Sequence, residues 1–479
     1  MTKFIKIIKW VLLLYIIYMI AGALLPFVHM KKAGEDFQQS FDPQSFYSES
    51  VGSDRARVVE TSMDALESRI TMIHQARERI VLSTFDIREG QSSLDIFSSL
   101  IEAANRDVKV QILVDGLYGF IHMSGNPVFY AAGTHPNIEI RYYNTPHLLK
   151  PWTFNGRLHD KYLMVDDKLL LLGGRNTFDY FLGEYNLKSL SYDRDVLIYN
   201  TASGNEEMYE NSVISQADEY FEDLWDSKYC KTVFHKPSSF MNKKITKALL
   251  QLEEHYTALA SSNPQLTASD RDYEQETTAI NKATLIYNPT HIYSKEPWVW
   301  YQIQYLMEHA SERTYIHTPY AVLSKDMYDG LAAVVAKVPD TTMLLNSTSV
   351  GDNFMASSDY TLNRPKILNT GVKLYEYFGD RSSHGKSILI DHRLALVGSY
   401  NLDMRSTYLD TETMLVIDGE EFNSQLENCI DDLASDSLLV SPDGTYENNP
   451  AVCVIPVSDS KKLIFAFTSL LFQLFRYLI

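Results

Sequence analysis

The chain has 479 residues, of which 45% are hydrophobic and 22% are charged, and its formal net charge is −18. This length exceeds what one hydrophobic core usually serves, and the composition excludes wholesale disorder, so we expect two core-forming units. The acidic balance and the lack of a long Lys/Arg block disfavour a nucleic-acid partner.

The first element is an apolar segment near the N-terminus. Residues 10–28 form an uncharged run of 19, which at about 1.5 Å per residue can cross about 30 Å of hydrocarbon. Three lysines precede the run, so the positive-inside bias places the N-terminus in the cytoplasm and the bulk of the chain outside the cell membrane. We interpret residues 1–30 as a single-span membrane anchor. A signal peptide cleaved near Ala21-Gly22-Ala23 is the alternative.

After a predicted polar stalk at residues 31–54, the chain shows two similar series of helices and strands, which favours an α/β architecture. The first unit, 55–235, has predicted helices at 62–76 and 94–104 and strands at 80–85, 108–114 and 138–143. The second unit, 281–440, has predicted helices at 298–310 and 325–337 and strands at 314–318, 342–345 and 372–377. Residues 236–280 are interpreted as a helical and polar linker.

The chain ends in a tail, residues 441–479, whose last part is rich in Phe and Leu. Residues 463–479 include Arg476 and are short for a second span, so we expect an apolar helix that lies in the membrane interface. A C-terminal helix packed on the protein core is the alternative.

The strongest signal is a pair of matching motifs, one in each unit. Each has a His, a Lys and an Asp at the spacing H-x-K-x(4)-D, followed by a Gly and an Asn. The members are His159, Lys161, Asp166, Gly173 and Asn176 in the first unit and His384, Lys386, Asp391, Gly398 and Asn401 in the second. All five recur at the same offset of 225 residues, which indicates an internal duplication.

The motifs fit phosphodiester chemistry. Side chains alternate along a strand, so His and Lys of each motif share a face and point into a common cleft. Phosphodiester exchange needs a nucleophile, a proton donor for the leaving oxygen and fixed positive charge near the phosphoryl oxygens. Two His and two Lys supply all three without a cofactor, and Asn176 and Asn401 can donate amide hydrogens to the phosphate.

Other site chemistries have less support. Cys230, Cys429 and Cys453 are an odd number with no pair at zinc-ligand spacing, and no cluster of carboxylates replaces them. We interpret these cysteines as packing residues, with one disulfide as the alternative, and expect no metal. Ser399 lacks the surroundings of a serine nucleophile.

The paired motifs resemble the phospholipase D superfamily, and the run of residues 398–406 strengthens the likeness. This resemblance implies two α/β/α sandwich domains related by a pseudo-two-fold axis, one active site at their interface and a phosphohistidine intermediate. It implies that Asn176, Ser399 and Asn401 bind the substrate phosphate and that His159 is the nucleophile. It further implies that His384 is the general acid and base.

The resemblance also implies a carboxylate downstream of each motif that orients a histidine. Glu412 is expected to hold His384, and Asp195 is the expected counterpart in the first unit. A carboxylate on the second ring nitrogen would fix the tautomer of the imidazole.

Within the superfamily, the chain is similar to bacterial cardiolipin synthases of the shorter C-type, through residues 173–176 with Tyr180-Phe181 and through residues 371–376. This similarity implies phosphatidyl transfer from a glycerophospholipid to a lipid alcohol such as phosphatidylglycerol, at a membrane and without an obligate protein partner. Hydrolysis to phosphatidic acid and a membrane-anchored nuclease are the alternatives. Asp410 and Ser357-Ser358 stand where this group often has Asn and His, which leaves the donor and acceptor lipids open.

Overall fold

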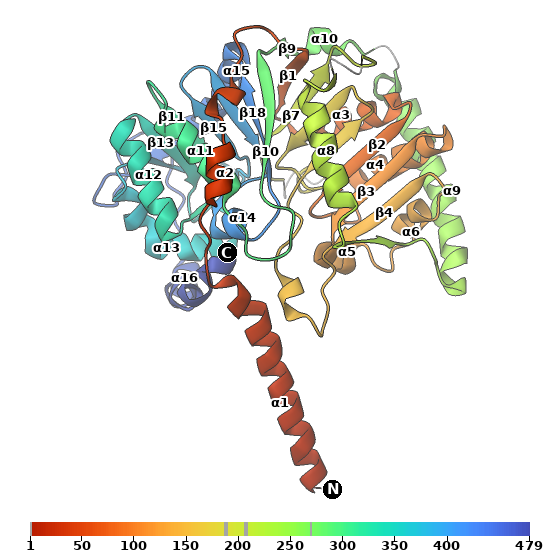
Figure 1. Cartoon of the computed structure of the whole chain (residues 1–479), viewed down its shortest axis with the longest axis horizontal. Coiled ribbons are helices and arrows are strands. Elements are labelled where there is room, and N and C mark those ends of the chain that lie inside the picture. Colours follow the sequence, from red (N-terminus) through yellow and green to blue (C-terminus); the bar gives the residue numbers. More distant parts are fainter. Residues whose placement is uncertain (1, 186–189, 206–208, 269–270) are drawn as a thin grey trace.

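The computed structural model describes residues 2–185, 190–205, 209–268 and 271–479 and shows two α/β domains side by side (Figure 1). The strands of the first domain are β1 (Asp54–Val59), β2 (Arg79–Thr84), β3 (Lys109–Asp115), β4 (Ile138–Tyr143), β5 (Tyr162–Val165), β6 (Leu169–Gly173), β7 (Asp195–Asn200), β8 (Cys230–Val233) and β9 (Thr278–Ala279). Those of the second are β10 (Lys282–Tyr287), β11 (Thr314–His317), β13 (Thr341–Asn346), β14 (Lys373–Tyr377), β15 (Ser387–Ile390), β16 (Leu394–Gly398), β18 (Thr413–Asp418) and β19 (Ser437–Leu439). A short pair, β12 (Ala321–Val322) and β17 (Leu402–Asp403), forms a separate ladder.

The two large sheets have the same strand order. The first runs β8-β4-β3-β2-β5-β6-β7-β1-β9, and the second, read in the same direction, runs β19-β14-β13-β11-β15-β16-β18-β10. The central strands β2, β3 and β4 are parallel, as are β11, β13 and β14, whereas β5 and β15 join them antiparallel. Within the two large sheets, only β9 has no counterpart among the described strands. The duplication predicted from the motifs is therefore confirmed for the fold.

Helices cover both sheets. In the first domain they are α3 (Ser62–Gln75), α4 (Gln91–Asn105), α5 (Gly116–His122), α6 (Pro127–Gly133), α8 (Val213–Trp225), α9 (Ser239–Ser262) and α10 (Tyr273–Glu276). In the second they are α11 (Trp298–Glu308), α12 (Lys325–Lys337), α13 (Phe354–Leu368), α14 (Met404–Tyr408) and α15 (Glu420–Ser435). Local chemistry sets where several begin, since Thr61, Ser212 and Ser324 each accept a hydrogen bond from a backbone N–H of the first helical turn.

One hydrophobic cluster joins the two domains. It includes side chains from the facing sides of both sheets and from α8 and α15, among them Leu172, Phe221, Val397, Leu415 and Phe422. All five side chains are almost fully buried. Because each domain supplies part of this core, the packing fixes how the domains sit against each other. A site between them therefore has a preset geometry.

The N-terminal region combines a projecting helix with a packed segment. Helix α1 (Thr2–Leu24) is long and apolar enough to span a membrane and extends away from both domains (Figure 1). The following residues, 31–54, were expected to form a polar stalk but lie against the second domain. Within this segment, α2 (Glu35–Ser40) places Phe37 on Trp298, with ring centroids 4.7 Å apart, and Phe46 is buried. The aromatic residues of this segment are irregularly spaced, so they give no periodic signal in the sequence.

The predicted linker, residues 236–280, is largely part of the first domain. Helix α9 packs its buried residues Ile245, Ala248 and Leu252 into the core that α4 and α6 share. Farther along, β9 pairs with β1 at the edge of the first sheet. Residues 269–270 of this stretch lie outside the described residues.

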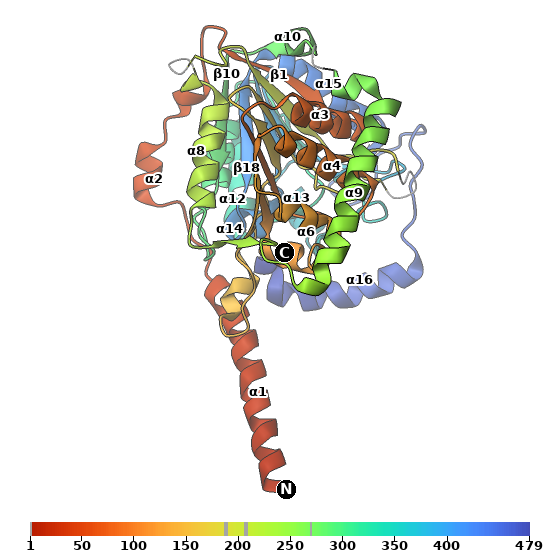
Figure 2. The ribbon, with the colours of Figure 1, turned by 90° about the vertical axis from the view of Figure 1, so that its right-hand side faces the viewer.

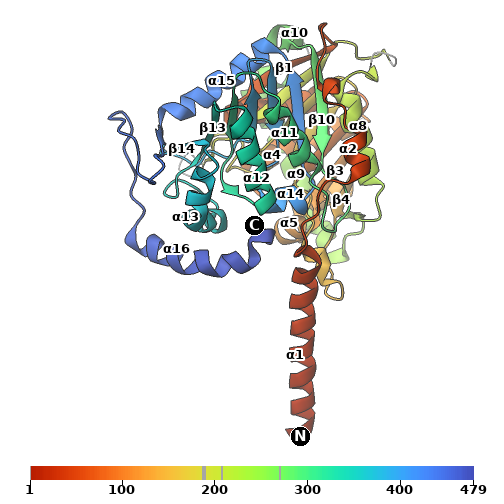
Figure 3. The same ribbon diagram turned by 60° about the vertical axis from the view of Figure 1, so that its left-hand side comes forward.

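The C-terminal helix α16 (Asp459–Phe472) has two different faces. One face packs beside α13, where Phe465 is buried and the hydroxyls of Ser358 and Thr468 lie 2.6 Å apart. The other face exposes the apolar side chains of Leu463, Phe467 and Leu470, and Leu474, just beyond the helix, is also exposed. Figures 2 and 3 show α16 running across the end of the molecule from which α1 projects. The packed face agrees with the alternative of a helix on the protein core, and the location of the exposed face in the membrane interface stays a prediction.

Candidate functional site

The two motif histidines occupy equivalent positions, directly before β5 and β15. In the antiparallel pairs, Tyr162 lies opposite Ser83 of β2 and Ser387 lies opposite His317 of β11. Each histidine thus lies at the edge where the parallel strands of its domain end. Helices α5 and α14 lie at the same edge, toward α1 (Figure 1). The candidate site therefore faces the end of the molecule that carries the projecting helix.

The motif lysines are buried beside their histidines. Nζ of Lys161 donates a hydrogen bond to the carbonyl of His159 at 2.5 Å, and Nζ of Lys386 donates to the carbonyl of His384 at 2.5 Å. Burial lowers the pKa of both ammonium groups, and that of Lys161 falls to about 7. The charge of Lys386 also lowers the pKa of Lys161, so the lysines of the two domains influence each other.

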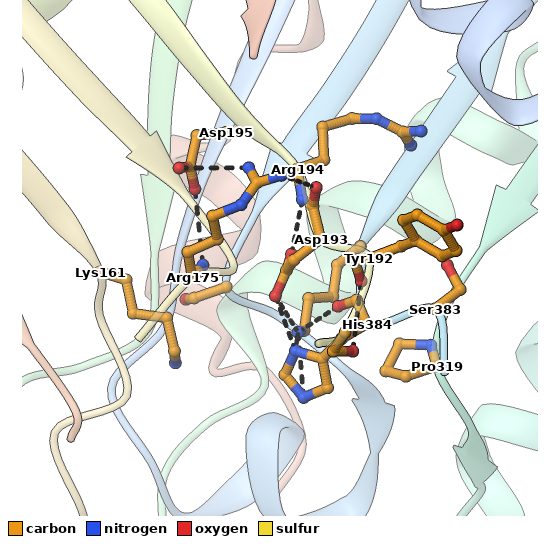
Figure 4. A network of polar contacts seen from close by, with 12 residues as sticks. Lys161, Arg175, Tyr192, Asp193, Arg194, Asp195, Pro319, Ser383 and His384 are labelled. Carbon is orange, nitrogen blue, oxygen red and sulfur yellow. Dashed lines mark hydrogen bonds and ion pairs between the residues drawn. The ribbon is translucent and has the colours of Figure 1, made fainter. Parts of the chain in front are cut away.

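Each histidine is held by a carboxylate from the other domain. Nδ1 of His159 lies 2.8 Å from Oε1 of Glu412, and Nδ1 of His384 lies 2.8 Å from Oδ2 of Asp193. Both carboxylates are fully or almost fully buried. Figure 4 shows Asp193 directed at the ring of His384. With Nδ1 engaged in this way, Nε2 of each imidazole is the nitrogen left to meet a substrate.

These contacts correct two expectations. Glu412 orients His159, whereas His384 was its expected partner. Asp195 does not contact a histidine; its carboxylate lies 3.0 Å from Arg69 and 3.3 Å from Arg175, away from His384 (Figure 4). The reason is that Asp195 is already the first residue of β7, inside the sheet, whereas Asp193 precedes the strand. The chain before the strand crosses to the other domain.

Backbone hydrogen bonds fix this crossing symmetrically. The N–H of Thr411 donates to the carbonyl of Arg157 at 3.0 Å, and the N–H of Tyr192 donates to the carbonyl of Ser382 at 2.9 Å. Arg157 and Ser382 are equivalent positions, two residues before the histidines. Each carboxylate-bearing segment therefore runs beside the opposite motif, which accounts for the exchange of carboxylates between domains.

The two histidines have different electrostatic surroundings. Burial lowers the pKa of His159 well below its ordinary value, and the charges of Lys161 and Lys386 lower it further. Burial also raises the pKa of Glu412 well above its usual range. For Asp193, burial alone would raise the pKa, but Lys386 and His384 bring it well below its usual range. His159 is thus held neutral, while His384 faces an ionised carboxylate.

The predicted phosphate-binding residues divide into two groups. Asn176 and Asn401 are buried, and the Oδ1 atom of each has no hydrogen-bond partner within the described part of the chain. Ser399 has another task, because its hydroxyl donates to Oε2 of Glu412 at 2.5 Å. We conclude that Ser399 supports the carboxylate that orients His159, and its expected contact with phosphate stays a prediction.

The motif aspartates lie at the opposite ends of β5 and β15 from the histidines. Asp166 accepts hydrogen bonds from the backbone N–H groups of residues 77–79, and Asp391 accepts them from those of residues 311–313. Both residues have positive φ angles, 52° and 53°. Their geometry assigns them to the turns that anchor the motif strands, away from the imidazoles.

Sequence reasoning missed two features of the site. Arg194 is buried, pairs with Glu60 and donates to Oγ of Ser387 at 2.9 Å, so it ties the first domain to the second motif strand. Aromatic rings also flank the histidines: Phe85 lies 5.1 Å from His159 and Phe181 lies 5.2 Å from His384, between ring centroids. The run Asp193-Arg194-Asp195 was the available signal for Arg194.

No group of three or more His, Cys, Asp or Glu side chains is arranged to hold a metal ion in the described ranges. The three cysteines are unpaired, so the alternative of a disulfide among them is not realised. Lys161 and Lys386 bring positive charge directly to the histidines.

The chain is similar in sequence to proteins of one known family. The family model described as "Cardiolipin synthase, PLD-like domain" matches residues 70–225 and 303–434, which together make up more than half of the chain and include both motifs. Cardiolipin synthase C of Escherichia coli (strain K12) is 26% identical over 410 residues, 76% of this chain and 81% of the relative. An uncharacterized protein of Helicobacter pylori is 25% identical over 426 residues, 80% of each chain.

A solved structure agrees at the level of the fold. Phosphatidylserine synthase of Haemophilus influenzae Rd KW20 superimposes with a TM-score of 0.62 at 15% identity, covering 88% of this chain and 95% of the other. The resemblance first read from the two motifs is thereby confirmed. With both motifs intact inside the matched segments, the chain belongs to the phospholipase D superfamily, in the family of cardiolipin synthase, PLD-like domains.

Proposed function

We propose that this protein is a phosphatidyltransferase of the cardiolipin synthase kind, which moves a phosphatidyl group to a lipid alcohol such as phosphatidylglycerol. The observation that carries the proposal is the crossed arrangement of His159 with Glu412 and His384 with Asp193 around two buried lysines. This arrangement offers a neutral imidazole as nucleophile, a second imidazole for proton transfer and two lysines beside them. The matching family and the name of the Escherichia coli relative support the same class of reaction.

The proposed reaction has two steps, formation and breakdown of a phosphohistidine. Nε2 of His159 attacks phosphorus, the bond from phosphorus to the leaving alcohol breaks, and the departing oxygen takes a proton from His384. The acceptor hydroxyl then gives its proton to His384 while its oxygen attacks phosphorus, and the phosphorus–nitrogen bond to His159 breaks. With phosphatidylglycerol as donor and acceptor, the products are cardiolipin and glycerol.

The assignment of the two imidazoles follows from their surroundings. A low pKa keeps a lone pair on His159, as a nucleophile requires. The carboxylate of Asp193 holds Nδ1 of His384 at 2.8 Å, which leaves Nε2 of that ring to exchange a proton with the substrate oxygens. Lys161, Lys386 and the amides of Asn176 and Asn401 are available to the phosphoryl oxygens, where charge develops.

The reaction is proposed to occur at a membrane surface. We infer that α1 crosses the cell membrane once, with the two domains outside the cytoplasm. The catalytic edge, the exposed Phe120 and Ile121 of α5 and the apolar face of α16 then all lie toward the bilayer (Figure 3). A lipid substrate would therefore travel a short path to the histidines.

The experiment that tests the proposal is incubation of purified full-length protein with phosphatidylglycerol, phosphatidylethanolamine or DNA, with products separated by mass. We expect cardiolipin and free glycerol from phosphatidylglycerol and no cleavage of DNA. Phosphatidic acid as the main product would instead identify a hydrolase, and degraded DNA would identify a nuclease.

The reaction should persist in excess chelator. Lys161 and Lys386 lie at the histidines and neutralise the phosphate, so bound divalent cations have no required role in the proposed steps. The measurement is the rate of cardiolipin formation before and after exhaustive dialysis against EDTA. A loss of turnover that added zinc or magnesium restores would contradict the mechanism.

The value of kcat/KM should fall as the pH rises above about 7. Lys161, with a pKa of about 7, is charged below that pH and loses its proton above it, so its support of the phosphate is lost on the alkaline side. Initial rates from about pH 5 to about pH 10 would show this limb. Lys161→Arg keeps a positive charge at this position, so the alkaline limb of its residual activity should move to higher pH. An unmoved limb would assign it to another group.

Replacing the exposed apolar face of α16 should weaken activity on bilayers. We expect Phe467→Ser with Leu470→Ser to lower the rate on phosphatidylglycerol vesicles about tenfold, because both side chains are open to the membrane interface. Activity on a short-chain phosphatidylglycerol below its micelle concentration should be unchanged. Val51→Ser, an exposed apolar control outside this face, should change neither rate. Equal losses on both substrates would indicate a folding defect.

A further inference from the structure

A second cavity, outside the catalytic site, lies at the same end of the molecule. Its volume is about 360 Å³, and it is lined by the loop between β4 and β5, the start of β8 and a loop of the second domain. Basic and aromatic side chains dominate the lining, namely His147, Lys150, Trp152, Lys228, Tyr229, Lys231 and Tyr293. Neither motif histidine and neither motif lysine contributes to it.

The charge of this cavity is unbalanced. Lys150, Lys228 and Lys231 are exposed, and no carboxylate of the described residues forms an ion pair with any of them. In a chain of net charge −18, most cations would be expected to find an anionic neighbour. Three ammonium groups without a carboxylate partner surround one cavity and match a phosphate group in charge; that of Lys228 lies 5.3 Å from the ring centroid of Tyr229.

The loop that forms the cavity lies along the candidate membrane span. The hydroxyls of Tyr15 and Tyr18 in α1 each donate to a loop carbonyl, those of Leu148 and Leu149, at 2.8 Å. Asn155 donates to the carbonyl of Ala23 at 2.7 Å. The loop descends beside α1 in both views (Figures 1 and 2). The side chains of Leu148 and Leu149 are 66% and 67% exposed, so they offer acyl chains an apolar surface next to the cavity.

A buried arginine, two residues before His159, is hydrogen-bonded to the segments that form the cavity. Arg157 is 1% exposed, and its guanidinium donates to the carbonyls of Asn144 and Asn155 at 2.9 and 3.1 Å. These bonds hold the segment between the cavity wall at Thr153 and the motif histidine His159. Because no histidine or lysine of the motifs lines the cavity, we treat the cavity as distinct from the proposed site of transfer.

We propose that this cavity binds the phosphate of an anionic membrane phospholipid, a molecule separate from the lipid that reacts at the histidines. The ammonium groups of Lys150, Lys228 and Lys231 hold the headgroup, while its acyl chains lie against Leu148, Leu149 and α1. Such a lipid would hold the loop between β4 and β5 at the bilayer, beside the edge of the sheets where the motif histidines lie. The proposal concerns binding alone and does not rest on the outcome of the transfer reaction.

The test counts bound lipids in a protein that cannot turn them over. Full-length His159→Asn in detergent micelles is titrated with phosphatidylglycerol or phosphatidylcholine, and bound lipids are counted by native mass spectrometry. We expect one phosphatidylglycerol in the catalytic cleft and one in the cavity. Replacing Lys150, Lys228 and Lys231 by Gln should remove the second and weaken its affinity about 10²-fold or more, given the attraction of about three cations for an anionic lipid.

Two matched variants control for charge and folding. Replacing Lys109, Lys168 and Lys325 by Gln removes the same charge elsewhere and should leave both lipids bound. Replacing the three cavity lysines by Arg keeps the charge and should retain the second lipid. Equal lipid counts in the parent and in the cavity Gln variant would overturn the proposal, as would equal binding of phosphatidylcholine.

A third arm distinguishes the source of the phosphate. Inorganic phosphate is added to the complex as a competitor. If it displaces the second lipid completely, the cavity is a site for free phosphate, and this result would also overturn the proposal. The parent could instead bind one lipid and the cavity Gln variant none. The catalytic cleft would then be the site that fails to hold a lipid, and the cavity proposal would stand.

Discussion

After a rapid alkaline quench, His384→Asn should carry radiolabelled phosphorus on the protein, and His159→Asn should carry none. The donor for this experiment is a phospholipid analogue with a leaving group that departs without a proton, so the first step does not need His384. His159 is the only partner for phosphorus in that step, and its low pKa keeps it ready to attack. Overall turnover of a natural lipid should fall by about 10² or more in both variants, because both roles are required.

His392→Asn is the matched control, since that imidazole is exposed and outside the site. It should keep full turnover and carry no trapped label beyond the parent. Label in His159→Asn with none in His384→Asn would reverse the two roles. Near-normal turnover in either site variant would overturn the mechanism.

Glu412→Gln should behave like a His159 variant, and Asp193→Asn should behave like a His384 variant. Each carboxylate holds the ring of the other domain, so its loss releases that ring from its tautomer and position. We expect kcat to fall about 10² to 10⁴-fold in each case, in the range of a serine protease that loses the carboxylate beside its histidine. With the activated donor, Asp193→Asn should still trap label and Glu412→Gln should not. The opposite pattern would show that each carboxylate serves its own domain.

Asp195→Asn, two residues from Asp193, is a contrasting variant that should affect stability and not catalysis. Its carboxylate lies between buried Arg69 and Arg175, so its loss leaves buried cations without a partner and should cost about 3–5 kcal/mol of stability. The melting temperature should drop, while kcat per folded molecule should stay near that of the parent. A large fall in kcat without a fall in stability would return Asp195 to the catalytic site.

The sequence predicted the fold class and the centre of the site, because both depend on local patterns. The two motifs repeat at one offset, and strand periodicity alone places His159 beside Lys161 and His384 beside Lys386. The equivalence of the two sheets then follows from duplication. What these residues share is that their neighbours in space are also near in sequence.

The carboxylates were misassigned because they are not near in sequence. From Asn176 to Asp193 the chain advances 17 positions, whereas from Asn401 to Glu412 it advances 11. The offset of the motifs therefore fails beyond the asparagines, and either acid of the run Asp193-Arg194-Asp195 fits an alternating pattern. Only the hydrogen bond from the N–H of Tyr192 to the carbonyl of Ser382, in the other domain, decides between Asp193 and Asp195. The roles of Ser399 and of Asp166 depend equally on contacts from distant segments.

The exchange of carboxylates gives the molecule the logic of a two-fold homodimer folded into one polypeptide, in which each partner completes the other's half-site. In a true homodimer the two imidazoles would be chemically identical until an asymmetric substrate bound between them. Here the inheritance is unequal, because one ring received an aspartate and the other a glutamate that is one methylene longer and paired to a serine hydroxyl. In the proposed mechanism both rings act on one phosphorus, and the unequal acids bias which ring attacks. The two halves therefore differ at the carboxylates, while both motifs keep the same His, Lys and Asp.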